Sequence, residues 1–369
     1  MIPNKIQLKL ANLQSHGDEK MFIEKLTPFL APTYENFPKG RTIGLVVLRT
    51  TLSETIFRTE GSGEPMCSES MHAGVDDKSI ISRLVMTKRK QIAPERRKGR
   101  ESLRAYDLLY TSPKGDSICS LNTNAPCEMC IDCFLYGFAA GGEGAQKSRV
   151  WTEDAFSLLP STEILGERTL NALYENGTMR LPQEDNGKAK ASTSLNTSEY
   201  IKPGVHFLDI VTFKDVTVDE LRYALGNILL TSRYGAVSSR IGRMDNEILG
   251  IFGGLSELPS SLELVQALHD YFNATGVVLE HPLNSSQLKE ALEQIISTWT
   301  NKRGISVQLS KEELASLIAD VDSNWSLFER ESFLKRLDRS YEAFRRIPVE
   351  KEAKKSQKKK NTATSNSES

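Results

Sequence analysis

Residues Pro203–Phe213 have the sequence PGVHFLDIVTF, which is apolar on both faces apart from His206 and Asp209. A short run of this kind is typical of a central strand that other elements cover on each side. The segment that follows, TVDELRYALGNILL, has the apolar spacing of a helix, and Asn246–Gly254, NEILGIFGG, favours another strand. Strand, helix and strand in this order predict half of a split βαβ unit, and hence an α+β fold.

Two capping boxes predict where helices begin. Glu220 follows Thr217 by three residues, and Glu313 follows Ser310 in the same way, so each pair satisfies two backbone donors at a helix start. The last third of the chain is helical in its apolar spacing. We expect its final helix near Trp325–Arg346, with a buried stripe that includes Phe328, Leu334 and Leu337.

The remaining segments predict the organisation of the chain. Arg41–Gly61 is rich in Val, Ile, Leu and Thr and favours one long strand or two. Residues 160–202 are long and polar with scattered apolar positions, which indicates a protruding hairpin or lobe. Residues 349–369 are too polar to repay the entropy of ordering, so we expect a disordered basic tail.

Composition excludes several classes of protein. Hydrophobic content of 39% with 26% charged residues describes a globular chain that can bury a core, and not a disordered one. The longest aliphatic run, Ile43–Leu48, is too short to cross a bilayer, so we expect a cytoplasmic protein without a membrane partner. Five cysteines, three of them crowded together, favour reduced thiols or metal ligands over a disulfide framework.

The cysteines have the spacing of a metal site. Cys127, Cys130 and Cys133 form a Cys-x2-Cys-x2-Cys run, and Cys119 precedes them by eight positions. Four thiolates would close a tetrahedral shell, which predicts a structural zinc ion. Cys67 or His72 is the alternative fourth ligand. An iron–sulfur cluster and unmetallated buried thiols remain the alternatives to zinc.

Positive charge is concentrated although the net charge is only −1. The segment 88–104 carries eight basic residues against two acidic ones, and 233–243 has three arginines and no acid. Arginine beside Gly, Ser or Tyr suits phosphate binding, because the backbone can approach closely while the guanidinium binds in a bidentate manner. A solvated surface is the alternative interpretation of both clusters.

Catalytic signals are weak. The five histidines are scattered, and we interpret His206 as a satisfied core residue. Asp76 and Asp77 are the one speculative catalytic pair, as acids over which a phosphodiester could lie, and solvated loop acids are the alternative. The sequence therefore favours binding over catalysis.

The segment SRYGAVSSRIGRMDNEILGIFGG, Ser232–Gly254, together with CEMCIDCFLYGFAAG and KSRVWTEDAF before it, resembles the backbone subunit of CRISPR type I-D effector (Cascade) complexes. That subunit belongs to the superfamily of repeat-associated RNA-binding backbone proteins. The resemblance covers about residues 41–254 and implies a modified RRM-like (ferredoxin-like) core with inserted lobes. It implies one compound domain over 1–348, with the core mainly in 41–112 and 203–257, a cysteine loop at 113–150, a thumb at 160–202 and a helical part at 258–348.

The resemblance also implies roles and partners. Copies would stack into a filament along a guide crRNA, beside other CRISPR subunits, and display its bases to target DNA, with RNA as the alternative target. Met179 and Leu181 would form an apolar wedge in the thumb. Tyr234 would stack on a base, and Gly235 would allow close approach of the backbone. The expected phosphate ligands are Lys88, Arg89, Lys90, Arg96, Arg97, Lys98, Arg100, Arg233, Arg240 and Arg243.

Two rival functions stay open at this point. In the first, the backbone subunit is also an endonuclease that cuts the guided strand at each repeat, through Asp76 or Asp77. In the second, the chain is a metal or redox protein unrelated to RNA.

Overall fold

The structure is a computed structural model of the chain. It describes residues 22–57, 67–112, 117–123, 125–140, 144–171, 195–235 and 241–345. Arg240, Met179, Leu181 and the basic tail lie outside these ranges.

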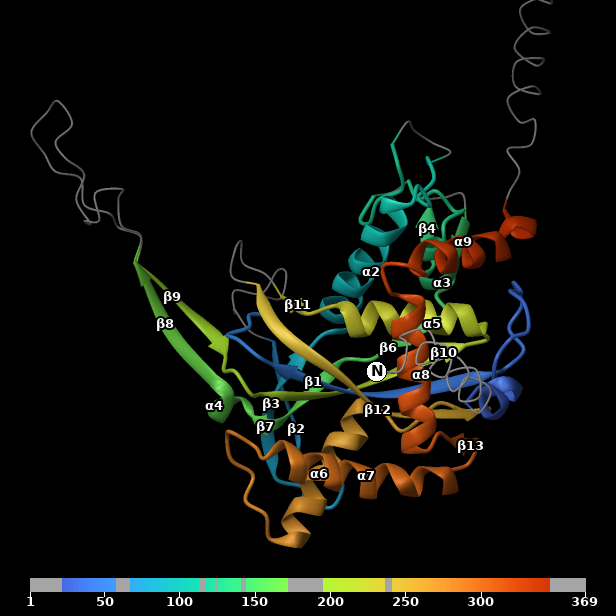
Figure 1. Cartoon of the computed structure of the whole chain (residues 1–369). Helices are drawn as coiled ribbons and strands as arrows, with labels where there is room; N and C mark the ends of the chain where they lie inside the picture. The colour runs from blue at the N-terminus through green and yellow to red at the C-terminus, as the bar shows by residue number, and fades with distance from the viewer. Residues whose placement is uncertain are drawn as a thin grey trace, which may run out of the picture.

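A curled antiparallel sheet is the centre of the fold (Figure 1). Its strands lie in the order β11-β12-β1-β10-β7-β3-β2, while β13 pairs with β12 and β6 pairs with β10. The bounds are β1 (Thr42–Thr51), β2 (Ser68–His72), β3 (Ile80–Met86), β6 (Val150–Thr152), β7 (Ala155–Pro160), β10 (His206–Lys214), β11 (Arg233–Tyr234), β12 (Gly242–Gly254) and β13 (Ile305–Gln308).

The predicted strand–helix–strand is confirmed. Both β10 and β12 pair antiparallel with β1, one on each side of it, so they run parallel to one another with β1 between them. Helix α5 (Val218–Leu230) connects them and begins with the predicted capping box, in which Thr217 accepts from the Glu220 amide. This is a split βαβ arrangement.

Helices cover both faces of the sheet, and each face has its own hydrophobic core. Successive side chains of β1 point alternately into one core and into the other. Leu45 and Val47 pack with α5 and the cysteine segment, whereas Val46 and Leu48 pack with the helices of the other face. Figure 1 shows α2 and α5 on one side of the sheet and α6 and α7 on the other. The helix bounds are α2 (Lys88–Ala105), α3 (Ile131–Tyr136), α4 (Ser161–Ile164), α6 (Ser261–Thr275), α7 (Ser285–Ser297), α8 (Lys311–Asn324) and α9 (Arg330–Ser340).

Single 3₁₀ turns lie at Thr27–Phe29, Thr298–Asn301 and Glu342–Phe344. The Ser310–Glu313 capping box is confirmed at the start of α8. The predicted final helix is shorter than expected, because α9 begins only at Arg330. Phe328 precedes it in a turn and is 91% exposed, so its predicted burial is wrong, whereas Leu334 and Leu337 are buried as predicted.

Two hairpins form small two-stranded sheets of their own. Strands β8 (Leu165–Asn171) and β9 (Leu195–Ile201) pair along their whole length, and Figure 1 shows them extending away from the body of the protein. Strands β4 (Phe138–Ala140) and β5 (Gly144–Gln146) form the second hairpin, directly after the cysteine segment. In the described part of the chain, no helix combines the length and the apolar character needed to cross a membrane.

The basic segment 88–104 is a continuous helix, α2, which the spacing of its apolar residues does not predict. Apolar periodicity does not reveal this helix, because few of its buried residues are apolar. The buried positions include Gln91, Glu95, Gly99 and Ser102. Pro94 lies inside it and removes one backbone donor, which further obscures the helical pattern.

Candidate nucleic-acid interface and metal centre

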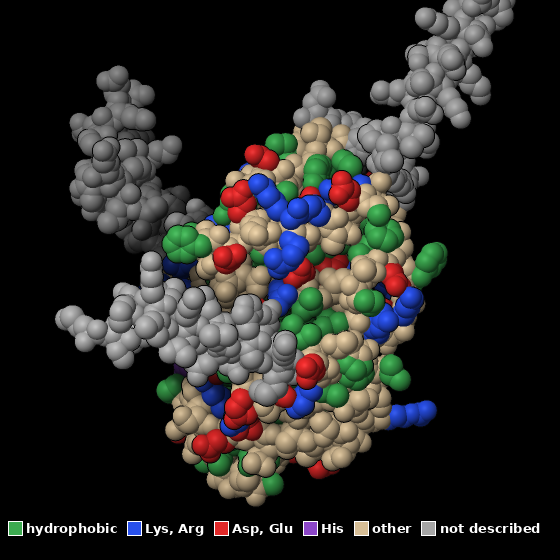
Figure 2. Space-filling model, turned by 45° about the vertical axis from the view of Figure 1, so that its right-hand side comes forward, with side chains coloured by type: hydrophobic (Ala, Val, Ile, Leu, Met, Phe, Trp, Pro, Cys, Tyr) green, Lys and Arg blue, Asp and Glu red, His purple; other side chains and the backbone are tan. Residues whose placement is uncertain are grey.

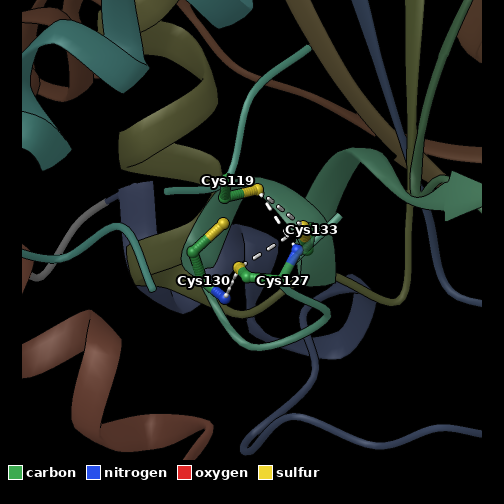
Figure 3. Close-up of side chains that lie close together, drawn as sticks. All are labelled: Cys119, Cys127, Cys130 and Cys133. Atoms are coloured by element: carbon green, nitrogen blue, oxygen red, sulfur yellow. Dashed lines mark hydrogen bonds between the residues drawn. The ribbon is translucent and has the colours of Figure 1, made fainter. Parts of the chain in front are cut away.

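The four cysteines come together in one buried cluster (Figure 3). The sulfur atoms of Cys119, Cys127, Cys130 and Cys133 all lie within 4.8 Å of one another. Of the alternatives for the fourth ligand, the structure brings Cys119 into the cluster. His72 instead approaches the carbonyl oxygen of Lys78 with its Nδ1.

Local backbone geometry builds the cluster. Glu128 adopts a positive φ of 63°, which turns the chain between Cys127 and Cys130. The amide of Cys130 donates to the Cys127 sulfur at 3.3 Å, and the amide of Cys127 donates to the Cys119 sulfur at 3.4 Å. Hydrogen bonding among the four thiols lowers the pKa of Cys119 but raises the pKa of Cys130 and of Cys133.

The donor set fits a tetrahedral soft-ligand metal. All four cysteines are free, buried and close enough to share one ion, and four thiolates suit zinc or an iron–sulfur centre. A closed shell of this kind has no open position for water, so the cluster would stabilise the fold and not catalyse a reaction.

Helix α2 divides its basic residues between two environments. Lys88, Arg89 and Arg97 are exposed, and Lys98 pairs with Glu101 at 3.3 Å. Arg100 is instead buried, and its guanidinium contacts the Asp132 carboxylate at 2.8 Å. The prediction of Arg100 as a surface phosphate ligand is therefore wrong, because its charge is already neutralised inside the protein.

Arg96 shares that arrangement. Its guanidinium donates to both oxygens of Asp132, at 3.0 and 2.7 Å, although it stays partly exposed. The guanidinium also lies over the Tyr136 ring, 5.3 Å from the ring centre. Arg96 thus combines an internal ion pair with a place on the surface of the helix.

A cavity of about 440 Å³ lies where α2, the cysteine segment and β11 meet. Basic residues of α2, among them Arg89, Lys90 and Arg97, line one side of it, and Gly235 lines another part. The segment that begins at Cys119 supplies the facing wall. A second cavity of about 320 Å³ adjoins it, because both share Arg97, Arg100 and the residues 120–122, and it extends the basic lining to Arg104. The structure therefore brings the basic face of α2, the cysteine segment and Gly235 of the second basic segment to one groove.

Arg233 and Arg243 lie directly opposite one another on β11 and β12, and both are exposed. Like charges in this position destabilise an antiparallel pair unless an anion lies between them. Gly235 has a positive φ of 72°, and a Cβ atom there would collide with the carbonyl oxygen of Ile56. This site suits a phosphate group, and only glycine fits the turn beside it.

Tyr234 is fully buried, so the prediction that its ring stacks on a base is wrong. Its hydroxyl donates to Glu95 at 3.1 Å and accepts from Asn246 at 2.8 Å and from Arg49 at 3.1 Å. A hydroxyl with three partners of this kind holds β11 against α2 and the sheet.

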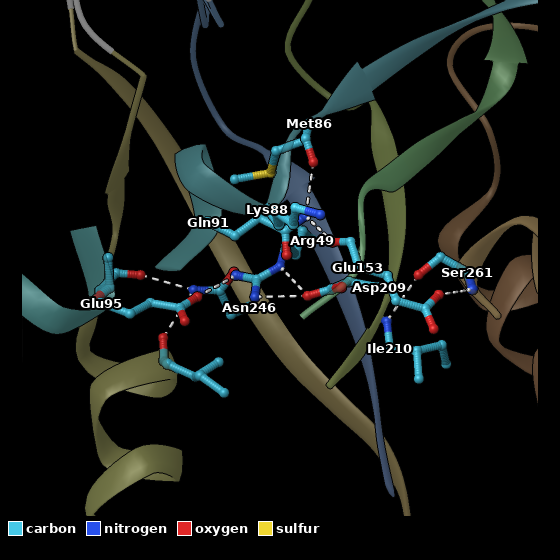
Figure 4. A network of polar contacts seen from close by, with 12 residues as sticks. Arg49, Met86, Lys88, Gln91, Glu95, Glu153, Asp209, Ile210, Asn246 and Ser261 are labelled. Carbon is cyan, nitrogen blue, oxygen red and sulfur yellow. Dashed lines mark hydrogen bonds and ion pairs between the residues drawn. The ribbon is translucent and has the colours of Figure 1, made fainter. Parts of the chain in front are cut away.

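Arg49 is the centre of that network, which the sequence analysis missed (Figure 4). Its guanidinium lies 2.8 Å from Glu95 and 2.8 Å from Asp209, and all three side chains are buried. Burial alone would lower the pKa of Arg49, but the Glu95 and Asp209 carboxylates outweigh it and raise the pKa. A signal was present in the sequence, since Arg49 and Asp209 are opposite charges that interrupt two apolar strands.

Asp76 and Asp77 lie in the turn between β2 and β3, which α6 holds through its own side chains. Asp270 accepts from the amide of Asp76 at 2.8 Å, and Asp77 lies 3.1 Å from the His269 ring. Hydrogen bonds from Ser79 and His269 lower the pKa of Asp77 to about 2. Because α6 and α2 cover opposite faces of the sheet, these acids lie away from the basic groove (Figure 1).

The side of the molecule that carries α8 and α9 has a different character. Figure 2 shows basic and acidic side chains interspersed on it. Arg336 pairs there with Asp219 at 2.8 Å, and Lys335 pairs with Glu331 at 2.6 Å. Charge on this side is largely balanced, in contrast to the groove along α2.

Comparison with one solved structure supports the fold, and a second structure is reported beside it. The crystal structure of Thermofilum pendens Csc2 is similar with a TM-score of 0.54 and 19% sequence identity, over 88% of this chain and 98% of that one. A chain of a CRISPR RNA-guided surveillance complex in a pre-nicking state has a TM-score of 0.44 and 9% identity, over 76% of this chain and 99% of that one. No curated protein matches the chain in sequence.

A family model described as Csc2 CRISPR matches residues 29–335. This match includes the whole sheet, helix α2, the four cysteines and the helices of both faces. Because it spans most of the chain, the protein belongs to the Csc2 CRISPR family.

Proposed function

We propose that this chain is the backbone subunit of a type I-D Cascade, with an RRM-like core, and that it assembles along a guide crRNA in the cytoplasm. Copies lie side by side in a filament with other effector subunits and present the guide bases for pairing with target DNA. Each copy binds guide phosphates in the groove between α2 and the cysteine segment. The β8–β9 hairpin belongs to the thumb that reaches the neighbouring copy.

The groove is the observation that supports this proposal most directly. Exposed cations line it along α2, and the basic positions from Arg89 to Arg104 span about 22 Å of helix at 1.5 Å per residue. An elongated basic groove follows a phosphate backbone and not a compact ligand. Sequence recognition is then left to base pairing by the guide.

The Arg233–Arg243 pair supplies a second contact, close in the chain to Gly235, which lines the groove. Both side chains are exposed, and Arg233 donates to the Ile241 carbonyl oxygen at 3.3 Å. One phosphate between the two arginines would relieve their repulsion. We therefore assign this pair to a guide phosphate.

Zinc is the metal that we propose for the four-cysteine centre. The cluster holds the wall that faces α2, so the ion would shape the groove without touching RNA. Cutting of the guided strand through Asp76 or Asp77 stays a prediction. The family match favours a CRISPR role over a metal or redox protein unrelated to RNA.

Titration of labelled single-stranded RNA at several salt concentrations tests the proposal. Five exposed arginines, Arg89, Arg97, Arg104, Arg233 and Arg243, predict a slope of about −3.5 for log affinity against log salt. Arg97→Ala should flatten this slope by about 0.7, since one phosphate contact is lost. Arg336→Ala, on the charge-balanced side, is the matched control and should leave the slope unchanged.

Nuclease protection of a long RNA tests the assembly. A filament protects at a regular period, whereas isolated binding gives aperiodic protection. An affinity that does not depend on salt, or protection without a period, would contradict the proposed function.

A further inference from the structure

Asp132 connects the cysteine cluster to the guide-binding helix. It lies between two of the clustered cysteines, Cys130 and Cys133, in the first turn of α3. Its side chain is fully buried, and it accepts three hydrogen bonds from two arginines of α2, at 3.0, 2.7 and 2.8 Å. A buried carboxylate is stable only with such partners, so this contact fixes the position of α3 relative to α2.

The two arginines make the contact rigid in a second way. Arg96 and Arg100 are four residues apart, and therefore lie on one face of α2, one turn from each other. Arg100 also donates to the carbonyl oxygen of Cys119, and Arg96 approaches the carbonyl oxygen of Gly137 at 3.5 Å. Both ends of the cysteine segment are thus attached to the same face of the helix.

Electrostatics agrees with this geometry. Burial alone would lower the pKa of Arg100, but the Asp132 carboxylate outweighs burial and raises it. The pKa of Arg96 is raised for the same reason. Both guanidinium groups therefore stay charged, and Asp132 has a permanent pair of cations to hold.

Both partners of the contact between Asp132 and the two arginines line the groove. Cys119, Cys133 and Asp132 line the larger cavity together with Arg96, Arg97 and Arg100. The wall formed by residues 119–123 begins at a cysteine of the cluster, and the opposite wall is α2 itself. The width of the groove is consequently set by how the cluster and α2 are joined.

We propose that Asp132 is the positioning residue through which metal occupancy of the four-cysteine centre controls the affinity of the groove for RNA. With an ion bound, the cysteine segment has one fixed conformation, and Asp132 transmits it to Arg96 and Arg100. Without the ion, the wall at 119–123 loses its fixed distance from α2, and the exposed arginines no longer match successive phosphates. This inference rests on the proposed function, because it concerns the same groove.

A comparison of four samples tests this proposal. The unsubstituted full-length chain and the full-length Asp132→Asn variant are each measured with metal and after its removal. The probe is fluorescein-labelled single-stranded RNA at one fixed salt concentration. We expect metal removal by a chelator to weaken RNA binding of the unsubstituted chain about tenfold. We expect Asp132→Asn to weaken it to a similar extent while it retains a stoichiometric amount of metal by elemental analysis. Removal of metal from Asp132→Asn should then change the affinity by less than about twofold, because the coupling is already lost.

Asp320→Asn is the matched control. It weakens another partly buried carboxylate–arginine pair, Asp320 with Arg222 at 2.6 Å, between α5 and α8 and outside the groove. We expect this variant to bind RNA as the unsubstituted chain does and to show the full tenfold response to the chelator. Its melting temperature also calibrates the loss of stability that a broken pair of this kind causes.

Three outcomes would overturn the proposal. One is an affinity that metal removal does not change, and another is an equal response to the chelator in Asp132→Asn and in the unsubstituted chain. The third applies if the metal-free chain unfolds, because only the metal-loaded proteins can then be compared. In that case, equal RNA affinities of Asp132→Asn and Asp320→Asn would overturn the proposal. A chain that binds metal and melts cooperatively but never binds RNA would instead refute the proposed function itself.

Discussion

Replacement of Arg49 by methionine should cost the protein a large part of its stability. The side chain is completely buried, and its guanidinium neutralises two carboxylates, Glu95 and Asp209, that are themselves at most 1% exposed. Methionine fills a similar volume but leaves both acids without a cation. Loss of one partner of a buried pair typically costs about 3–5 kcal/mol, against a total stability of about 5–15 kcal/mol for a folded domain.

The loss of unfolding free energy in Arg49→Met should become larger as the pH rises. Burial already raises the pKa of Glu95 and of Asp209. A carboxyl group with a raised pKa in the folded state holds its proton longer than in the unfolded state, so its contribution to stability is lost as pH rises through that pKa. Without Arg49 both pKa values rise further. We therefore expect Arg49→Met to be destabilised more at pH 8 than at pH 5.

Urea unfolding followed by circular dichroism at these two pH values measures both effects. Arg222→Met is the matched control, since its partners Asp219 and Asp320 lie nearer the surface and should regain solvation when the guanidinium is removed. A second variant, Arg49→Met with Asp209→Asn, should recover part of the loss. A cost below about 1 kcal/mol, or the same cost at both pH values, would refute the claim that Arg49 compensates buried charge.

Four further experiments address single features. Burial lowers the pKa of His206 to about 4, so stability should be lost as pH falls from about 6.5 to about 4, by about 3 kcal/mol, and His206→Gln should abolish this part of a melting-temperature profile. Cys130→Ser should lose its stoichiometric metal by elemental analysis and melt at a lower temperature, whereas Cys67→Ser should retain both. Gly235→Ala should lose about 1–3 kcal/mol in urea unfolding, because alanine must adopt φ of 72° beside the Ile56 carbonyl group. Asp77→Ala should leave RNA affinity within about twofold, and a cleavage assay on the guided strand shows whether this acid also cuts.

The central strands β1 and β10 could be predicted because they are apolar on both faces, whereas the exposed strand β2 gives no such signal. Strand β10 and helix α5 follow directly from the spacing of their apolar residues and from the Thr217–Glu220 capping box. Helix α2 could not be recognised in this way, since it buries Gln91 and Glu95 and carries a proline. Apolar periodicity reports burial only where the buried residues are apolar.

Some residues of the candidate site could also be predicted from the sequence, and others could not. The cysteine spacing predicted the cluster, because ligands close in sequence need only a local turn to meet. Tyr234 and Arg100 were expected at the surface, but their partners Glu95 and Asp132 lie in segments distant in sequence. Neither residue type nor local spacing indicates a partner of this kind.

Strand β1 also determines how the chain can reach its folded state during synthesis. Both of its neighbours in the sheet, β10 and β12, come from the region after residue 205, so the strand leaves the ribosome long before either partner exists. At 5–20 residues per second, translation from Thr51 to His206 takes roughly 8–30 s. For that period a ten-residue strand with two apolar faces has no sheet to join. Nascent chains should therefore depend on chaperones, and poor recovery in overexpression should reflect this delay and not the stability of the finished fold.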